Sequence, residues 1–574
     1  MSGVLAKCSK NMSIALLILL MASMLFPYSA WATIEDEDQT SLTADELLAA
    51  ISAGAVDTQV DSGDSGLNAN SRATMSASHF EEYSGAELYD TAAAQSAGAF
   101  ASSEYAIVVG RGGWPDALSA TSLAGVYRCP ILFTEKDSVP AATASELARL
   151  GVSHILLVGG PNLVSQGGLD ALGSATGAEV ERIWGESLFD TQMAVYERGA
   201  GQWSGDLVIV ATGADFPDAL SIAPVAYAKK APVFLVSGGG LLPEQKTALM
   251  DAARSGSFAN AAIAGGTNVV SEATEGFMDA VTVLASGRTG GCVRLAGAEL
   301  YDTSAAVAEW AVSTQGFSWA APAFATGRDS YDALAGSVLQ GESGSVLLLV
   351  DDPQDATVRT AASHAGDVSS VRFFGGRNVV SSAVRMGIAD SFGYSYASLP
   401  GFRVYIDAGH GWNDSNNGVY DSGATGCGYQ EATLAKELAG MVANILRNEY
   451  GVSVYLNDDG GWYKLRHAEA VAQKCDTIVS IHFNAGGGSG TESLIHEYNA
   501  AGLSPSWQSQ IHPHLIIGTG LHDRGMKRQE VAILGGPLPA TLLEVAFIDS
   551  QSDMNQYQAR KVTIAYEIAA GIVE

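Results

Sequence analysis

Basic residues and cysteines are scarce in this sequence of 574 residues. Lys and Arg number 31 against 62 Asp and Glu, so the formal net charge is −31. Nucleic-acid binding needs clustered Lys and Arg to contact phosphates, and the composition therefore excludes nucleic acid as the main partner. There are only five cysteines and no C-x-x-C pair, which argues against a cysteine zinc site. Beyond the first residues, the disulfide state is left open for Cys129, Cys292, Cys427 and Cys475.

Long apolar runs are also missing, apart from one at the N-terminus. Lys7 and Lys10 precede an apolar stretch at 14–26, and Ala30-Trp-Ala32 follows it with small residues. This order is typical of an export signal, and the stretch is shorter than the ~20 residues that span a bilayer. We predict a signal peptide at 1–32 and a secreted mature chain without a membrane span. A retained N-terminal anchor is the alternative.

The remaining length and composition predict several globular domains. A chain of this length is too long to fold around one hydrophobic core. Its composition, with 47% hydrophobic and 16% charged residues, is typical of well-packed globular domains. Residues 33–78 are acidic and rich in Ser, Asp, Gly and Ala, which is typical of a linker.

Three landmarks recur in the same order along residues 79–398. The first starts at Gly85, Gly185 and Gly297, so the copies begin 185 − 85 = 100 and 297 − 185 = 112 residues apart. The landmarks are Gly-Ala-Glu-Leu-Tyr-Asp-Thr, Trp-Pro-Asp-Ala-Leu and Gly-Gly-Pro-Asn-Leu-Val-Ser in the first copy, with close variants in the other two. The segment therefore contains three tandem domains.

Within each copy, short apolar runs alternate with Ala-rich helical patterns. Alternating strands and helices predict an α/β fold whose parallel sheet is covered on both faces. The Gly-Gly pair after the last such strand predicts a tight turn. The Asp residues in the second landmark are predicted to cap the helix that follows; they are Asp116, Asp218 and Asp332.

The ordered landmarks resemble the type 2 cell-wall-binding repeat of Gram-positive surface proteins. The resemblance implies three flavodoxin-like α/β repeats at 79–181, 182–290 and 291–398. It also implies that they hold the chain non-covalently on anionic cell-wall polymers. The strongly acidic chain would need a local basic groove or bridging cations for that purpose.

Histidine, rare before Pro400, occurs seven times after it. His410 follows a short apolar strand, His482 ends a second, and Glu544 ends a third. Glu431 starts an amphipathic helical pattern. Because strand ends of a parallel sheet share one rim, we expect these four side chains to lie together.

Two imidazoles and one carboxylate form a suitable ligand set for catalytic zinc, which keeps one position for water. A further carboxylate, buried among apolar residues, has a raised pKa and can move the proton of that water. The sequence therefore predicts a Zn²⁺ site. His512 and His514 are the alternative ligands if one is misassigned.

Residues 401–574 resemble the zinc-dependent N-acetylmuramoyl-L-alanine amidases, through Ile406-Asp-Ala-Gly-His410-Gly, Ser480-Ile-His482-Phe-Asn-Ala485 and Leu543-Glu544-Val-Ala-Phe-Ile548. The resemblance implies an amidase domain with a mostly parallel twisted sheet that acts on peptidoglycan. It implies that His410, Glu431 and His482 bind Zn²⁺, that Glu544 is catalytic, and that Asn484 and Arg524 contact substrate. Trp412 departs from the family pattern, which usually has a second Gly there.

Two other functions fit these residues. A zinc peptidase of peptidoglycan cross-links would use the same ligand set. A non-enzymatic surface or adhesion protein could keep an inactive amidase-like domain, although the intact site residues argue against it. We expect a secreted, wall-associated peptidoglycan hydrolase.

Overall fold

The computed structural model describes residues 79–238, 240–413 and 418–574. The predicted signal peptide and acidic linker lie outside these residues. Among the described helices, none is both long and apolar enough to cross a membrane. The four cysteines in the described part of the chain are free thiols.

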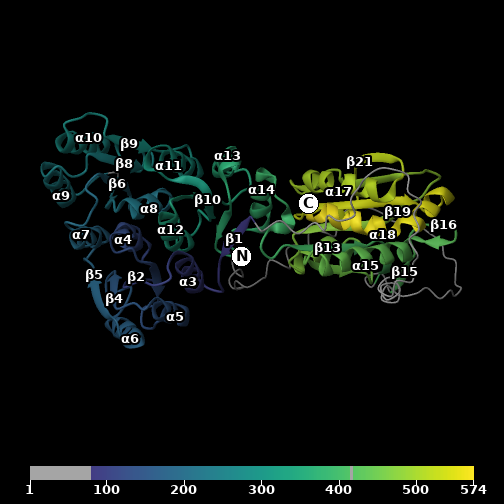
Figure 1. The fold of residues 1–574 in the computed structure, drawn as a ribbon, viewed down its shortest axis with the longest axis horizontal. Coiled ribbons are helices and arrows are strands. Elements are labelled where there is room, and N and C mark those ends of the chain that lie inside the picture. The colour runs from purple at the N-terminus through teal and green to yellow at the C-terminus, as the bar shows by residue number, and fades with distance from the viewer. Residues whose placement is uncertain (1–78, 239, 414–417) are drawn as a thin grey trace, which may run out of the picture. The chain divides into compact units, whose positions relative to one another are not determined.

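Residues 80–398 form three four-stranded sheets with the orders β3-β2-β4-β5, β7-β6-β8-β9 and β11-β10-β12-β1 (Figure 1). All the strand pairs in them are parallel. The predicted α/β class is thus confirmed. The strands are β1 (Phe80–Tyr83), β2 (Tyr105–Gly110), β3 (Ile131–Thr134), β4 (His154–Val158), β5 (Glu179–Ile183), β6 (Leu207–Thr212), β7 (Val233–Val236), β8 (Asn260–Ala264), β9 (Cys292–Leu295), β10 (Ser318–Ala325), β11 (Ser345–Leu349) and β12 (Val371–Phe374).

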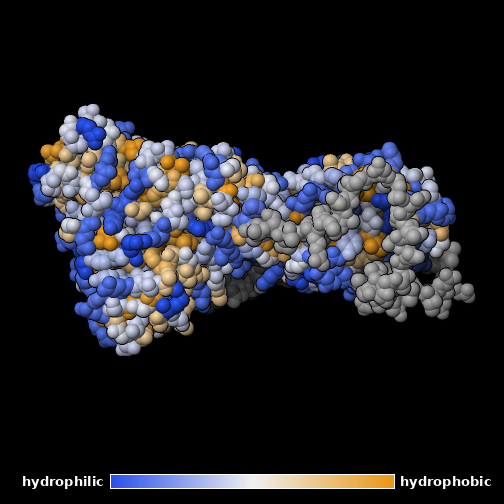
Figure 2. Space-filling view, in the orientation of Figure 1, coloured by the Kyte–Doolittle hydropathy of each residue, from blue (hydrophilic) through white to orange (hydrophobic). Residues whose placement is uncertain are grey.

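Helices connect these strands and cover the sheets, because parallel strands need crossover connections. On the face drawn in Figure 2, hydrophilic and hydrophobic residues are interspersed over the repeats. The helices are α3 (Leu88–Ala99), α4 (Trp114–Tyr127), α5 (Ala141–Leu150), α6 (Gln166–Thr176), α7 (Leu188–Arg198), α8 (Pro217–Lys229), α9 (Pro243–Arg254), α10 (Glu272–Ser286), α11 (Leu300–Gln315), α12 (Tyr331–Ser343), α13 (Ala356–Ser363) and α14 (Ser382–Phe392), with the short turns η1 (Ala365–Asp367) and η2 (Tyr396–Ser398).

The repeated Asp and Gly-Gly landmarks meet in space. Each Asp is the second or third residue of its helix rather than its cap, and the helices α4, α8 and α12 begin without a side-chain cap. The capping prediction is therefore wrong. Each carboxylate instead lies against the first Gly of the turn, where a Cβ would approach its oxygen to 2.8, 2.6 and 2.3 Å. The pairs are Asp116 with Gly159, Asp218 with Gly265, and Asp332 with Gly375.

This close approach explains why the turn needs glycine. The three glycines have φ values of +120°, +117° and +94°, in the region that disfavours a side chain. The turn prediction is confirmed. Burial beside the turn raises the pKa of Asp116 and of Asp332 to about 6.

The third sheet is completed by a strand from the start of the described chain. β1 pairs in parallel with β12, from Phe80 opposite Val371 to Tyr83 opposite Phe374. The first and second sheets are completed by the strands that follow them in sequence, β5 and β9. Sheets and sequence repeats are thus offset by one strand, and the domain boundaries stay predictions.

A guanidinium binds the Gly-Gly turn in all three units. Arg182 on β5 donates to the carbonyl of Gly159, and Arg294 on β9 donates to that of Gly265, at 3.0 and 2.8 Å. In the third sheet, β1 takes the place that β5 and β9 have in the other two. The strand register puts Glu82 of β1 at the position that Arg182 and Arg294 occupy in those strands.

In the third unit the arginine comes from the helix instead. Arg385 on α14 donates to the carbonyls of Gly375 and Val380, at 2.7 and 2.9 Å, and pairs with Glu82. It is 1% exposed. The acidic Glu82 of β1 thus partners this buried cation, whereas β5 and β9 carry an arginine at the matching position.

We expect Arg385→Met to loosen the β1–β12 pair. Loss of one partner of a buried ion pair costs about 3–5 kcal/mol, because the other charge stays buried. Hydrogen–deuterium exchange of the β1 and β12 amides should accelerate about 100-fold, and adding Glu82→Gln should restore part of the protection. Arg359→Met on α13, at an exposed arginine, is the control. Unchanged exchange in β1 would contradict the assignment.

Residues 403–573 form a separate six-stranded sheet of order β18-β13-β19-β22-β20-β21. β20 runs antiparallel to β22, and the other pairs are parallel. The mostly parallel sheet is as predicted. Its strands are β13 (Arg403–Ala408), β18 (Ser453–Asn457), β19 (Thr477–Asn484), β20 (Thr491–His496), β21 (Asp523–Gln529) and β22 (Ala540–Phe547), and two small hairpins add β14 (Gly411–Asn413), β15 (Val419–Asp421), β16 (Thr425–Gly426) and β17 (Tyr429–Gln430).

Helices cover both faces of this sheet. The long helix α18 packs against α15 and against α17, and all three contact the sheet (Figure 1). The short elements α16 and η4 contact each other, and both contact strands of the sheet. The long helices each bury one side, and α15 has the clearest amphipathic pattern. The helical elements are α15 (Glu431–Asn448), α16 (Arg466–Ala472), α17 (Ser504–Thr519), η4 (Ala532–Leu534) and α18 (Gln551–Val573).

Candidate metal and catalytic site

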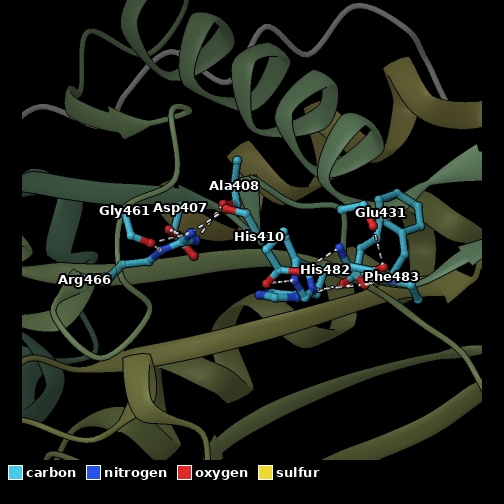
Figure 3. Close-up of polar contacts among 12 residues, drawn as sticks. Asp407, Ala408, His410, Glu431, Gly461, Arg466, His482 and Phe483 are labelled. Carbon is cyan, nitrogen blue, oxygen red and sulfur yellow. Dashed lines mark hydrogen bonds and ion pairs between the residues drawn. The ribbon is translucent and has the colours of Figure 1, made fainter. Parts of the chain in front are cut away.

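Three of the predicted site residues converge at the carboxyl end of β13 and β19. Nε2 of His410 lies 3.0 Å from Oε2 of Glu431, and Nδ1 of His482 lies 2.9 Å from Oε1 of the same carboxylate (Figure 3). One ligand atom from each residue lies within 4.8 Å of the others. The structure therefore brings together three side chains that could hold one metal ion.

Each side chain is placed by the element that carries it. His410 lies two residues after the end of β13, which pairs with β19, and Glu431 is the first residue of α15. His482 lies inside β19 and Glu544 inside β22, because the pairing continues past the predicted strand ends to Asn484 and Phe547. The neighbouring parallel strands explain why distant sequence positions meet here.

Two glycines make room for the rings. A Cβ on Gly409 would lie 2.5 Å from the ring of His482. A Cβ on Gly423 would lie 2.6 Å from the ring of His410 and 2.7 Å from Oε2 of Glu431. Any larger residue at either position would push the predicted ligands apart.

Glu431 is buried and accepts hydrogen bonds on both oxygens. Besides the two imidazoles, the backbone amides of Ala424 and Phe483 donate to it, at 2.8 and 3.1 Å. Burial alone would raise the pKa of Glu431, but the two histidines hold it well below its usual range. The carboxylate is therefore ionised, as a metal ligand must be.

Asp421 orients the first histidine. Its Oδ2 lies 2.9 Å from Nδ1 of His410, opposite the nitrogen that faces Glu431. Burial opposes protonation, but hydrogen bonds to Asp421 and Glu431 raise the pKa of His410 to about 10. A carboxylate on the second nitrogen is the usual arrangement around a metal-binding histidine. A cation bound here would displace a proton, so its affinity rises with pH.

A buried ion pair fixes the loop that carries His410. Arg466 donates from Nη1 to Oδ1 of Asp407 and to the carbonyl of Ala408, both at 2.9 Å, and from Nη2 to the carbonyl of His410 (Figure 3). Asn457 donates to the same carboxylate at 3.0 Å. No local pattern predicts a role for Arg466, because its acceptors meet it only in the folded chain.

Glu544 lies on β22, with its Cα opposite that of His482. Its Oε2 is buried and has no hydrogen-bond partner among the described residues. Burial, with the nearby carboxylates, raises the pKa of Glu544 to about 7, although the histidines oppose this. An unpartnered carboxyl group that titrates near neutrality is suited to proton transfer.

The two predicted substrate contacts share one acidic partner. Nδ2 of Asn484 donates to Oε1 of Glu492 at 3.1 Å, and Nε of Arg524 donates to Oε2 at 2.6 Å. Lys527 completes this charged group, and Glu492 faces Glu544 across the β20–β22 pair. Sequence reasoning missed Glu492 as the residue that holds the others together.

The remaining predicted positions lie elsewhere. His512 bonds Ser493 and Asp523, and His514 bonds Glu567 of α18 and the side chain of the last residue, Glu574. Neither joins the metal cluster. Beside that cluster lies a cavity of about 280 Å³ lined by Asp407, His410, Gly411, Asp421, Gly461, Tyr463, Arg466, His482, Val531 and Ile533.

We expect Arg466→Met to weaken the binding of a divalent metal ion such as Zn²⁺ at His410, Glu431 and His482 by about 10–100-fold, because such outer contacts position the side chains that would hold it. Competition between the full-length chain and a chelator measures this affinity. Arg466→Lys should be intermediate. Arg447→Met, at an exposed arginine on α15, serves as the control. Equal affinity in Arg466→Met and in the wild type would contradict the positioning role.

Comparison with known families divides the chain in the same way. Residues 404–574 match the N-acetylmuramoyl-L-alanine amidase family. Residues 82–167, 182–275 and 294–385 each match cell wall binding domain 2.

Three of the relatives come from Bacillus subtilis. The chain is 24% identical over 478 residues to the N-acetylmuramoyl-L-alanine amidase LytC, covering 82% of this chain and 89% of the relative. It is 37% identical over 159 residues to a sporulation-specific N-acetylmuramoyl-L-alanine amidase, and the match covers 27% of this chain and 59% of the relative. The uncharacterized protein YqiI is 32% identical over 163 residues, and the match covers 28% of this chain and 76% of the relative. Among solved structures, Cwp6 from Clostridium difficile is 24% identical, with a TM-score of 0.48, covering 86% of this chain and 79% of that one.

Proposed function

The chain belongs to the N-acetylmuramoyl-L-alanine amidase family and carries three cell wall binding domains, and on that premise we propose how it works. It hydrolyses the amide between N-acetylmuramic acid and L-alanine in peptidoglycan, with Zn²⁺ held by His410, Glu431 and His482. The observation that supports this most is the set of three ligand atoms within 4.8 Å of one another, beside the unpartnered carboxyl group of Glu544.

The residues present suit zinc. Two imidazoles and one carboxylate leave a position for water, and Asp421 supplies the outer carboxylate that fixes the tautomer of His410. Zn²⁺ bound by this set supplies Lewis-acid polarisation of the scissile carbonyl and lowers the pKa of water.

Glu544 is the proton carrier in this proposal. With a pKa near 7, it accepts a proton from the attacking water and donates it to the leaving amine of L-alanine. The new C–O bond replaces the broken C–N bond, so one water is consumed and no other reactant is needed. Asn484 and Arg524, which share Glu492 as a hydrogen-bond partner, bind the substrate beside Glu544.

The repeats hold the enzyme at its substrate. A secreted chain with a signal peptide at 1–32 and a linker at 33–78 would present the repeats at 79–181, 182–290 and 291–398 to the wall, and the amidase domain at 401–574 to peptidoglycan. We propose anionic wall polymers as the ligands of the repeats. Because the chain is itself acidic, that attachment should depend on bridging cations or local basic groups.

We expect Glu544→Gln to reduce wall hydrolysis by about 10²–10⁴-fold, since it removes the proton carrier while keeping the side-chain shape. Zn²⁺ content and sedimentation with purified cell walls should be unchanged. Turbidity loss of the wall suspension, metal analysis and pelleting measure the three properties. Equal clearing by the variant and the wild type would overturn the role of Glu544.

The cleaved bond distinguishes an amidase from a peptidase. Mass spectrometry of digested wall should find stem peptides with free L-alanine amino ends and uncut sugar strands. New ends at diamino-acid or D-alanine positions would instead identify a peptidase of the cross-links. No release by a Zn²⁺-loaded chain would favour a non-enzymatic wall protein.

A further inference from the structure

Four aromatic residues gather at one side of the metal site. Trp412, Tyr420 and Tyr463 are 53%, 41% and 51% exposed, and Trp462 is half-buried. We call these four residues the aromatic platform. Large aromatic side chains are usually buried, so an exposed group of this kind marks a binding surface.

The first half of the platform is built on the hairpin that follows His410. Trp412 pairs with Tyr420 across β14 and β15, and their ring centroids are 5.2 Å apart in an edge-to-face arrangement. The next pair in the register is Gly411 with Asp421, the carboxylate that orients His410. The hairpin therefore carries the platform and a site residue on adjacent positions.

The second half is joined to the first by the backbone. Gly461 donates its amide to the carbonyl of Trp412, and Gly460 bridges to Trp412 in a parallel pair. A Cβ on Gly460 would lie 2.2 Å from that carbonyl oxygen, so only glycine permits this contact. Trp462 and Tyr463 follow at once in the chain.

Among the described residues, the aromatic and cation contacts of these rings are with one another and with Lys464. No hydrogen bond involves the side chain of Trp412, Trp462 or Tyr463 within the described residues. Nζ of Lys464 lies 5.6 and 5.8 Å from the ring centroids of Trp462 and Tyr463. Tyr463 also lines the cavity that contains His410 and His482. The platform is thus continuous with the reaction site.

The two flanks of the site differ in chemistry. The sheet order places β18 and β13 on one side of β19, and β22, β20 and β21 on the other. The platform follows β13 and β18, whereas the charged group of Glu492, Arg524 and Lys527 lies on β20 and β21.

The substrate has two halves that match these flanks. The stem peptide carries carboxylates, which suit guanidinium and ammonium groups. The sugar strand is uncharged along its ring faces, which present C–H groups. Aromatic faces carry partial negative charge and attract such hydrogens while burying apolar surface.

We propose that the aromatic platform binds the sugar strand that flanks the cleaved muramic acid, leaving the stem peptide to lie toward Arg524. This inference rests on the proposed amidase function, and it deepens that function by assigning a glycan subsite. The enzyme then prefers muropeptides that carry more than one sugar.

The test compares substrates that differ in sugar length. Full-length wild type and the Trp412→Ala/Tyr463→Ala double variant are assayed on N-acetylmuramoyl-peptide and on the same peptide carrying a disaccharide or a tetrasaccharide. The wild type should favour the longer sugars. The double variant should lose about tenfold more kcat/KM on the tetrasaccharide than on the single sugar, mostly through KM. An equal loss on all substrates would overturn the subsite.

Two further variants test whether the loss of sugar-length preference is specific to the platform. Trp412→Phe keeps a ring and should retain most of the preference. Tyr566→Ala removes an exposed aromatic that bonds Glu449, at the far end of α15 from Glu431, and should leave the preference unchanged. Loss of preference in Tyr566→Ala would also contradict a subsite at the platform.

A binding assay separates this inference from the proposed reaction. N-acetylglucosamine tetramer is titrated by calorimetry into full-length Glu544→Gln, with and without the platform substitutions. Weaker binding on platform loss supports the subsite even if no amide is hydrolysed. Identical binding of the tetramer with and without the platform substitutions would overturn the glycan subsite. Weaker binding of a sugar-free stem peptide instead of the tetramer would also overturn it. Neither outcome would affect the assignment of amide hydrolysis.

Discussion

The C-terminal site depends on one buried carboxylate. Glu431 sits where β13, β19 and α15 meet, and four donors from three segments converge on its two oxygens. A buried charge with fewer partners would be costly, so this geometry is strongly constrained. The constraint fixes the rings of His410 and His482 on either side of one point, and their neighbours Gly409 and Gly423 have no room for a side chain.

Other buried ion pairs fix further parts of the chain in a similar way. Arg466 and Asp407 hold the His410 loop, and Arg385 with Glu82 attaches β1 to the third repeat sheet. In both cases a guanidinium also binds backbone carbonyls at a turn. Its fixed planar geometry allows one side chain to satisfy several acceptors at once. The reaction site and the repeats are thus stabilised by related devices with different purposes.

The site also divides its surroundings by chemistry. His410 follows β13, His482 lies on β19 and Glu544 lies on β22, which are three adjacent strands, and Glu431 reaches the same point from the start of α15. An aromatic flank and a charged flank lie on either side of this group. This arrangement suits a substrate that joins a sugar to a peptide, because each half meets groups that complement it. The hairpin of Trp412 and Tyr420 supplies the aromatic flank without disturbing Asp421 at its base.

Local apolar patterns and motif spacing were enough to predict the three repeats, the α/β class, and the convergence of His410, Glu431 and His482 near Glu544. Sequence reasoning misjudged Asp116, Asp218 and Asp332 as helix caps, since their contact with a glycine turn comes from a segment about 43 residues or more away. Only the tertiary structure decided that β1 completes the third sheet, that Glu492 links Asn484 to Arg524, and that the aromatic residues near 412 and 463 share one surface. Such pairings depend on long-range packing and buried charge, which no local pattern records.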